Sequence, residues 1–521
     1  MRTLDPQLIY PSARFFLTFI RERRLASTFF QHTFDALPAL ADARRACPDS
    51  ATRAAVCDVL SCYNRELGAS PAALQAIDAL RDPAALCVVG GQQAGFLGGP
   101  LFVACKIASI VCTAHHLRER LGVPVVPIFW LATEDHDFDE INRVQWTDPA
   151  GQLQTIAFDW PDRGRSIERL PITSEVRRAY DDARRRLSFA DPTLADVFAP
   201  ASGDTYARWH ARIWSRLFAD SGLILVEPRV LRALSAPLFD RARTDAPRIH
   251  SLLADGAARL EADGYAPPLD PQRSGTLFVI DDSGARHRLD DAATDDDQPR
   301  VDMLSPDAAL RPVLADALLP TVAQVLGPSE LAYHAMLRPL YEHWSIPQPV
   351  PVPRHGGTVI SADDAVLLSR LGVPPEALLG DRDVPRDALS ARASEDLRAT
   401  FRASESALEA ALAPLREDLA ALDPGLDARW RQTLDQCRHH LSRLEDRAVR
   451  ADLARQGISA KRFLALRSLL WPNERPQERV VSAVSVIARH GVEWIGTLVA
   501  CGEPDRFIHR LIVLEDPHEQ G

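Results

Sequence analysis

Two short apolar runs that enclose a helix-length apolar segment constrain the fold of this chain more than any other feature. Residues 85–89 and 125–132 are continuously apolar, and the segment between them, residues 100–121, begins with a proline and ends at Gly122. In a parallel sheet that is covered on both faces, the strands are continuous apolar runs and do not alternate between apolar and polar residues. The pattern predicts a strand–helix–strand unit, and hence an α/β core with a parallel sheet.

Other segments extend this core along the chain. With 521 residues, the sequence is too long for one ordinary hydrophobic core, so two to four structural units are expected. The predicted elements are helices within residues 1–80, strands at residues 222–227 and 276–282, helices at residues 314–325 and 330–343, and an extended proline-rich segment at residues 347–353.

Leucines spaced alternately four and three residues apart predict a different structure near the C-terminus. They stand at positions 408, 412, 415, 419, 422 and 426, and the pattern resumes at Leu434, Cys437, Leu441 and Leu444. Such a heptad seam is typical of helices that pack as a coiled coil. Pro424 and Gly425 interrupt it, which predicts two antiparallel helices joined by a tight turn. An ordinary amphipathic bundle is the alternative.

Charge and cysteine content limit the functional class and the compartment. The formal net charge of −11 argues against a general nucleic-acid-binding protein, which needs a basic surface. None of the eight cysteines forms a C-x-x-C pair and several lie in apolar runs, so we expect a reducing compartment and no metal site. Residues 1–24 do not have the organisation of a signal peptide, and no uninterrupted apolar run has the length of a membrane span. A cytoplasmic protein with neither a membrane nor a nucleic-acid partner is expected.

A glycine-rich loop follows the first predicted strand. Residues 90–100 are Gly-Gly-Gln-Gln-Ala-Gly-Phe-Leu-Gly-Gly-Pro. Glycines let the backbone approach a ligand closely, and the N-terminus of the following helix favours an anion. We predict that this region contacts substrate through Gln92, Gln93, Gly95, Gly99 and Lys106. A purely structural turn is the alternative, because the loop matches neither a P-loop nor a G-x-G-x-x-G motif.

An acidic loop follows the second predicted strand. Residues 133–142 are Thr-Glu-Asp-His-Asp-Phe-Asp-Glu-Ile-Asn, in which five carboxylates flank one histidine. Like charges this close repel unless a cation, a metal or basic side chains compensate. The predicted catalytic residues are Glu134, His136 and Asp137, and the predicted substrate contacts are Asp135, Asp139, Glu140 and Asn142. Magnesium bound by Asp137 and Asp139, or a solvated acidic loop, are the alternatives.

The two loops are expected to be neighbours in space. Parallel strands carry the loops that follow them at the same edge of the sheet, where open α/β sheets bind their ligands. Gln92 or Gln93 should therefore approach His136 or Asp137 closely enough for one small ligand to touch both loops.

A third segment adds further candidate substrate contacts. Residues 327–333 combine a turn with Glu330 and Tyr333, whose spacing places them on one face of a helix. Arg338 and Arg354 are candidates for binding a carboxylate or phosphate, and structural ion pairs are the alternative for both.

Taken together, these segments resemble the bacillithiol biosynthesis cysteine-adding enzyme family. The matching segments are residues 91–100 with Lys106, residues 123–142, 304–312, 318–333 and 472–479. The acidic string at residues 134–140 is a specific marker, and the heptad seam matches the coiled coil of the family. Leu326, Ser329 and His334 depart from the family pattern, which leaves the local shape of the turn before Tyr333 open.

The resemblance implies a Rossmann-like core with connecting insertions, a C-terminal antiparallel coiled coil and a homodimer. We predict an N-terminal helical segment at residues 1–80 and a core at residues 81–385, with insertions near residues 150–220 and 283–303. A helical hairpin at residues 386–455 and a C-terminal segment at residues 456–521, packed back on the core, complete the predicted domains.

The resemblance also implies the last step of bacillithiol synthesis, the amide bond between L-cysteine and glucosaminyl-malate. That reaction needs an activated carboxyl, usually through ATP, so ATP with Mg²⁺ is expected and a tightly bound cofactor is not. His136 would act as the base, and Lys106, Arg338 or Arg354 would hold carboxylates or phosphate. Two alternatives stay open: another carboxylate-activating or nucleotidyl-transferring enzyme, although no His-x-Gly-His motif is seen, and a non-catalytic metabolite-binding coiled-coil scaffold.

Overall fold

The computed structural model describes residues 2–22, 24–160, 164–187, 189–289, 299–380, 394–423, 425–500, 504 and 506–515. The chain divides into two compact units. An α/β unit comprises Met1–Trp146, Gln154–Val359 and Gln477–Gly521, and a helical unit comprises Thr147–Leu153 and Ile360–Pro476. Parts of the predicted domains therefore lie outside the described residues, among them residues 161–163, 188 and 290–298 of the predicted insertions, residues 381–385 of the predicted core, residues 386–393 and Pro424 of the predicted hairpin, and residues 501–503, 505 and 516–521 of the predicted C-terminal segment.

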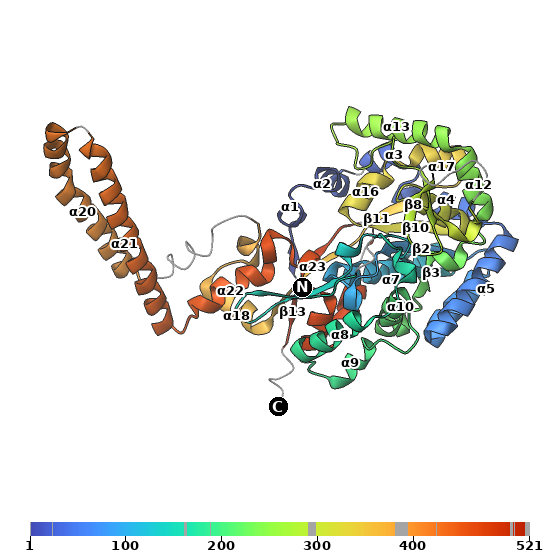
Figure 1. Ribbon diagram of the computed structural model, residues 1–521, viewed down its shortest axis with the longest axis horizontal. Coiled ribbons are helices and arrows are strands. Elements are labelled where there is room, and N and C mark those ends of the chain that lie inside the picture. Colours follow the sequence, from blue (N-terminus) through green and yellow to red (C-terminus); the bar gives the residue numbers. More distant parts are fainter. Residues whose placement is uncertain are drawn as a thin grey trace. The chain divides into compact units, whose positions relative to one another are not determined.

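A five-stranded parallel sheet forms the centre of the α/β unit (Figure 1). Its strands, in spatial order, are β11 (Val350–Pro353), β10 (Thr321–Leu326), β2 (Leu86–Gln92), β3 (Val125–Leu131) and β6 (Ile224–Val226). Val89 of β2 lies opposite Gln324 on one side and Ile128 on the other. The predicted parallel α/β fold is confirmed, and the two apolar runs that define it are adjacent strands of this sheet.

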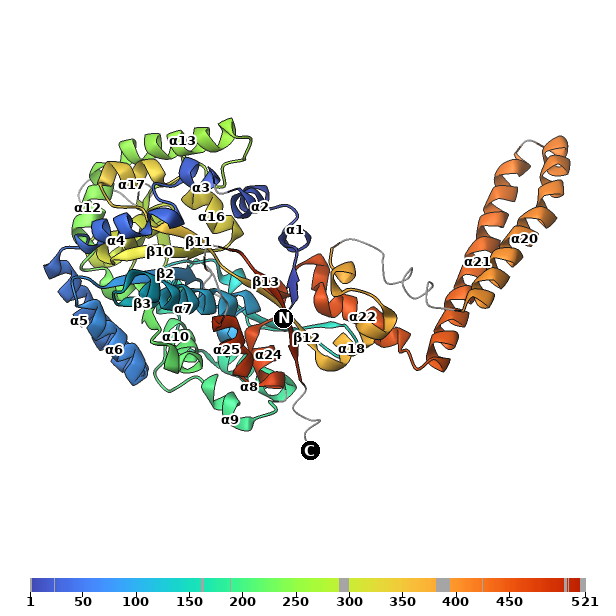
Figure 2. The same cartoon turned by 180° about the vertical axis from the view of Figure 1, so that it is seen from behind.

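Side chains that alternate along β2 enter two separate hydrophobic cores. Leu86 and Val88 pack into the core that contains α7 (Leu101–Leu121), whereas Cys87 and Val89 pack into the core that contains α5 (Ser50–Leu67) and α6 (Pro71–Leu80). In Figure 2, α7 lies next to β2 and β3. Burial on both faces explains why the strands are continuously apolar. In the described part of the chain, α7 alone has the length and hydropathy of a membrane span, but 78% of that window is buried inside the protein.

Residues 314–325 do not form the predicted helix. α15 (Leu310–Leu318) ends before Pro320, and the next six residues are β10 of the central sheet. That prediction was wrong because a short apolar run cannot be assigned by periodicity alone, whereas the β-branched Thr321, Val322 and Val325 favour a strand. The helix predicted at residues 330–343 is two helices, α16 (Pro328–His334) and α17 (Arg338–Trp344).

Small sheets and helices surround the central sheet. β7 (Leu277–Ile280) pairs antiparallel with β8 (Arg286–Arg288) and β9 (Leu304–Pro306), which confirms the strand predicted at residues 276–282. The other sheets are β1 (Arg2–Leu4), β13 (His509–Leu514) and β12 (Gly356–Ser361), and β4 (Arg143–Thr147) with β5 (Leu153–Ala157). The α/β unit further contains, among its described residues, the α-helices α1 (Pro6–Ile9), α2 (Arg14–Arg21), α3 (Arg24–Phe29), α4 (Leu37–Arg45), α8 (Ser174–Leu187), α9 (Pro192–Val197), α10 (Tyr206–Leu217), α11 (Pro228–Leu231), α12 (Ala236–Thr244), α13 (Ala246–Ala262), α23 (Gln477–Val480), α24 (Ala483–His490) and α25 (Glu493–Val499).

The helical unit contains a long antiparallel hairpin. Its helices are α20 (Glu395–Leu422) and α21 (Leu426–Arg455), accompanied by α18 (Ala362–Leu371) and α22 (Ala460–Leu470). Contacts pair later residues of α20 with earlier residues of α21: Arg416 lies 2.7 Å from Asp427, and the Trp430 indole donates to the Leu412 carbonyl at 3.0 Å. The predicted coiled-coil hairpin is confirmed.

Candidate functional site

A cavity of about 390 Å³ opens at the carboxyl-terminal edge of the central sheet. Residues that end or follow β2, β3 and β10 line it together with the beginnings of α15 and α16. We call it the edge cavity. Its polar and aromatic lining consists of Gln92, Gln93, Trp130, Asp135, Glu140, Arg311, Gln324, Ser329, Glu330, Tyr333 and His334, beside Gly90 and Gly91. Ligands of open α/β sheets bind at this edge.

The glycine-rich and acidic loops meet at this cavity. The Gln93 side-chain amide donates to Asp135 Oδ2 at 2.7 Å. The two loops are therefore neighbours as expected, but the contact uses Asp135, not His136 or Asp137. The His136 side chain is 43% exposed, and neither His136 nor Asp137 lines the edge cavity. Their predicted catalytic roles stay predictions.

One side of the edge cavity is acidic. Burial raises the pKa of the Glu140 carboxyl, and the negative charges of Asp137 and Asp135 raise it further. Burial also acts to raise the pKa of Asp135, but Arg311, Gln93 and Arg286 lower it overall. The cavity thus holds one carboxylate stabilised in its charged form and one that is more readily protonated, which suits a ligand bearing an amine.

Arg311 supplies the positive charge of the cavity. Among the described residues that line it, Arg311 is the only permanent cation, because burial lowers the pKa of His334 to about 3 and keeps that imidazole neutral. Arg311 was not predicted as a site residue. It lies within residues 304–312, one of the segments that resemble the family. Because residues 314–325 were predicted as a helix, the strand β10 beside Arg311, and with it this part of the sheet edge, was not expected.

Lys106 does not line the cavity but contacts three residues that do, Gly91, Gln92 and Glu330. The ammonium group is buried and donates to the Gly91 carbonyl at 2.7 Å, to Gln92 Oε1 at 3.1 Å and to Glu330 Oε2 at 2.5 Å. Burial alone would raise the pKa of Glu330, but the Lys106 charge lowers it overall, whereas burial lowers the pKa of Lys106. Lys106 therefore fixes the end of β2 to α16 and has no free donor left for a phosphate.

The second half of the glycine-rich loop, residues 95–101, forms a hydrogen-bonded turn. The backbone N–H groups of Phe96, Gly98, Gly99 and Leu101 donate to the carbonyls of Ile141, Gly95, Phe96 and Val481, respectively. A Cβ on Gly95 would lie 2.6 Å from Gly99 Cα, so the glycines allow two backbone segments to pack together. Neither Gly95 nor Gly99 lines the edge cavity, and the amides named here are not available to an anion.

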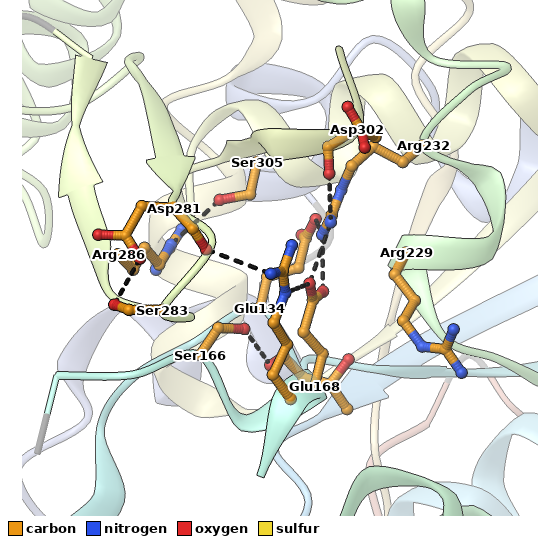
Figure 3. A network of polar contacts seen from close by, with 12 residues as sticks. Glu134, Ser166, Glu168, Arg229, Arg232, Asp281, Ser283, Arg286, Asp302 and Ser305 are labelled. Atoms are coloured by element: carbon orange, nitrogen blue, oxygen red, sulfur yellow. Dashed lines mark hydrogen bonds and ion pairs between the residues drawn. The ribbon is translucent and has the colours of Figure 1, made fainter. Parts of the chain in front are cut away.

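A buried ion-pair network holds the first residue of the acidic string (Figure 3). Arg232 donates to Glu134 Oε1 at 2.9 Å and to both carboxylate oxygens of Glu168, at 3.0 and 2.6 Å. Burial raises the pKa of Glu134, although Arg232 opposes this. Glu134 lies outside the lining of the edge cavity, so its contacts do not place it against a ligand there.

The remaining predicted contacts also lie outside the edge cavity. Arg354 forms a buried bidentate pair with Glu478, at 2.7 and 3.2 Å. Arg338 donates to Glu342 and to the carbonyls of residues 27, 28 and 30. Asn142 is buried and accepts a hydrogen bond from Arg143, and Asp139 is exposed. In the part of the chain that the structure describes, no cluster of three or more His, Cys, Asp or Glu side chains is arranged to hold a metal ion.

Comparison with known proteins agrees with this arrangement. Fold and site together define a Rossmann-like α/β protein with a coiled-coil hairpin and a polar cavity at the sheet edge. Residues 4–355 match the N-terminal Rossmann-like domain of the bacillithiol biosynthesis protein BshC, and residues 357–514 match its C-terminal coiled-coil domain. The chain belongs to the BshC family.

Relatives cover most of the chain. The protein of Geobacillus thermodenitrificans is 30% identical over 501 residues, which are 89% of this chain and 90% of the relative. That of Solibacter usitatus is 29% identical over 493 residues, 89% of this chain and 90% of the relative. That of Koribacter versatilis is 30% identical over 470 residues, 86% and 87% of the two chains. All three are named "Putative cysteine ligase BshC".

Proposed function

We propose that this chain is a cysteine ligase of bacillithiol biosynthesis, which joins L-cysteine to glucosaminyl-malate through an amide bond. The observation that carries the proposal is the edge cavity, which Asp135 and Glu140 line together with Arg311, the only guanidinium among the described residues of its lining. Glucosaminyl-malate has complementary groups, because it combines an amine with carboxylates. Membership of the BshC family and the names of the relatives support the same assignment.

The acidic side of the cavity suits the amine of the acceptor. In this proposal Asp135 holds the ammonium form, and Glu140, whose pKa is raised by burial, takes the proton that must leave before the nitrogen can attack. Arg311 binds a malyl carboxylate, since guanidinium groups match carboxylates in bidentate geometry. Trp130 and Tyr333 add aromatic surface for the sugar ring. His136 and Asp137 keep their predicted roles on the exposed end of the same loop.

ATP, accompanied by Mg²⁺, is proposed as the cosubstrate that activates the cysteine carboxyl. The amides of Gly95, Phe96, Gly98, Gly99 and Leu101 and the ammonium of Lys106 donate to protein acceptors, so these groups do not offer the anion site that the sequence suggested.

Product analysis tests the proposal. The purified chain is incubated with cysteine, glucosaminyl-malate, ATP and Mg²⁺, and the products are identified by mass spectrometry. Formation of bacillithiol that depends on ATP is the expected result, and His136→Ala is expected to reduce it strongly. Turnover with a different acid only would overturn the assignment in favour of another carboxylate-activating enzyme. Binding without turnover would favour a non-catalytic scaffold.

We also propose that the chain is a cytoplasmic homodimer formed through α20 and α21. The hairpin leaves seam leucines uncovered: Leu415 is 49% exposed, Leu444 57% and Leu422 78%. Exposed apolar stripes of this kind favour association. Removing residues 395–445 should give a monomer or an insoluble core, and a truncated chain that remains dimeric by light scattering would contradict the proposal.

A further inference from the structure

A second, much smaller cavity adjoins the edge cavity. It has a volume of about 20 Å³ and is lined by Glu134, Arg232 and Ser235 and by three residues that also line the edge cavity, Trp130, Arg311 and Ala315. We call it the inner cavity. Because Trp130 and Arg311 line both cavities, a group bound in the inner cavity can affect the position of their side chains in the edge cavity.

Residues around the inner cavity carry four buried polar atoms without a partner. Within the described part of the chain, Glu134 Oε2, Trp130 Nε1, Arg232 Nε and Arg311 Nε are each buried and make no hydrogen bond. Such atoms are rare in folded proteins, because each one loses its hydration without compensation. Because these four atoms belong to residues that surround one cavity, a single ligand inside it can pair with several of them at once.

The chemistry of these atoms identifies that ligand. One atom is a carboxylate acceptor and the other three are N–H donors, so the ligand must both donate and accept hydrogen bonds. A water molecule needs a cavity of only about 10–15 Å³ and two to four polar partners. A volume of about 20 Å³ admits one water and no larger molecule.

Glu134 and Glu168 differ in a way that gives the water a role. Both oxygens of Glu168 accept from Arg232, whereas Glu134 accepts with Oε1 and leaves Oε2 unpaired (Figure 3). Glu134 lines the inner cavity and Glu168 does not. The two carboxylates therefore share one guanidinium, but only Glu134 can act on the substrate pocket through the cavity.

We propose that the inner cavity binds one ordered water, which accepts from Trp130 and Arg311 and donates to Glu134 Oε2. Glu134 is then a positioning residue: it holds Arg311 in place for a ligand carboxylate without touching the ligand itself. The inference rests on the proposed function only for the nature of that ligand.

The first test is a crystal structure of the wild-type full-length chain at a resolution that resolves ordered water. Density for one water within about 3.2 Å of Glu134 Oε2 and of the Arg311 or Trp130 nitrogen is expected. A structure in which these atoms contact one another directly, or in which no such density is found, would overturn the proposal.

The second test compares Glu134→Gln with its matched control Glu168→Gln, using malate as the probe in calorimetric titrations. Each variant removes one negative charge from the same guanidinium. Glu134→Gln weakens the acceptor that anchors the water, so Arg311 turns towards Asp135 and the dissociation constant of malate rises about tenfold. Glu168→Gln should stay within about twofold of wild type.

The direction in which the dissociation constant of malate changes shows whether Glu134 acts by positioning Arg311 or only by its negative charge. If Glu134 acted by charge alone, its neutralisation would tighten malate binding, and Glu168→Gln would do the same. Either tighter binding or equal weakening in both variants would overturn the proposal. Neither test needs turnover, so failure of the ligase reaction with intact malate binding refutes the proposed function and leaves the water and the role of Glu134 standing.

Discussion

The α/β unit buries charge, whereas the hairpin of the helical unit exposes leucine. Lys106, Arg232 and Arg354 are each at most 5% exposed, and each contacts a carboxylate. In the hairpin, Leu422 is 78% exposed while ion pairs such as Arg416 with Asp427 lie at the surface. A buried charge costs free energy unless an oppositely charged group pairs with it. An exposed leucine costs free energy unless another surface associates with it and covers it. The two regions therefore call for different tests.

The largest expected effect comes from breaking a buried pair. Arg354→Met leaves the Glu478 carboxylate buried without its bidentate partner, and removing one member of such a pair typically costs about 3–5 kcal/mol. Urea unfolding of the wild type and the variant measures this loss directly.

The hairpin provides the matched control for that variant. Arg416→Met removes the same type of side chain from a surface pair, and its free energy of unfolding should be indistinguishable from wild type. The double variant Arg354→Met with Glu478→Leu should recover much of the loss, since it leaves no unpaired charge. Equal losses in the two single variants would remove the distinction between buried and exposed charge.

Arg311 is expected to have the next largest effect, on binding. Arg311→Met removes the only permanent cation among the described residues that line the edge cavity, so kcat/KM for glucosaminyl-malate should fall about 100-fold. Arg338→Met, which removes an arginine that contacts Glu342 and backbone carbonyls, is the control and should change kcat/KM less than about threefold. Equal effects of the two variants would show that Arg311 does not bind substrate.

The sequence predicted the sheet edge because its determinants are local. β2, α7 and β3 follow one another along the chain, so the parallel strands bring the loops at Gln93 and Asp135 together. The charged partners could not be predicted in the same way. Arg232 is 98 residues from Glu134 and 64 from Glu168, and no spacing rule connects positions so far apart. Glu134 was thus predicted as a catalytic residue and Arg354 as a substrate contact, although the fold pairs each with a protein group.

The same limit explains the residues that were missed. Arg311 follows the short strand β9, and its position at the cavity depends on β10. The apolar run at residues 314–325 was predicted as a helix, so β10 was not expected there. In the hairpin, the heptad spacing predicted the helices correctly because each seam position repeats within one helix. The heptad spacing of the leucines is the same whether the partner helix belongs to the same chain or to a second one, so it does not predict a contact with a second chain.

His334 should make stability depend on pH. Burial lowers its pKa from the ordinary value of 6.5 to about 3, so the native imidazole stays neutral while the unfolded chain takes up a proton below pH 6.5. The stabilising contribution is complete above that pH and is lost as the pH falls towards 3, by about 2 kcal/mol between pH 7 and pH 5. His334→Gln should reduce the slope of the unfolding free energy against pH, and a slope equal to that of the wild type would contradict this prediction.

The smallest expected effect concerns one exposed leucine of the hairpin. If α20 and α21 associate with a second chain, the side chain of Leu422 becomes buried on dimerisation, and Leu422→Ser should raise the dimer dissociation constant about tenfold in sedimentation velocity. Leu464→Ser is the control, because Leu464 is 40% exposed in the same unit but lies on α22 outside the hairpin. A monomeric wild type, or equal effects of the two variants, would mean that the exposed leucines of the hairpin do not mark an interface. An effect of Leu422 alone would show that apolar exposure in this region, like buried charge in the α/β unit, is balanced by a specific partner.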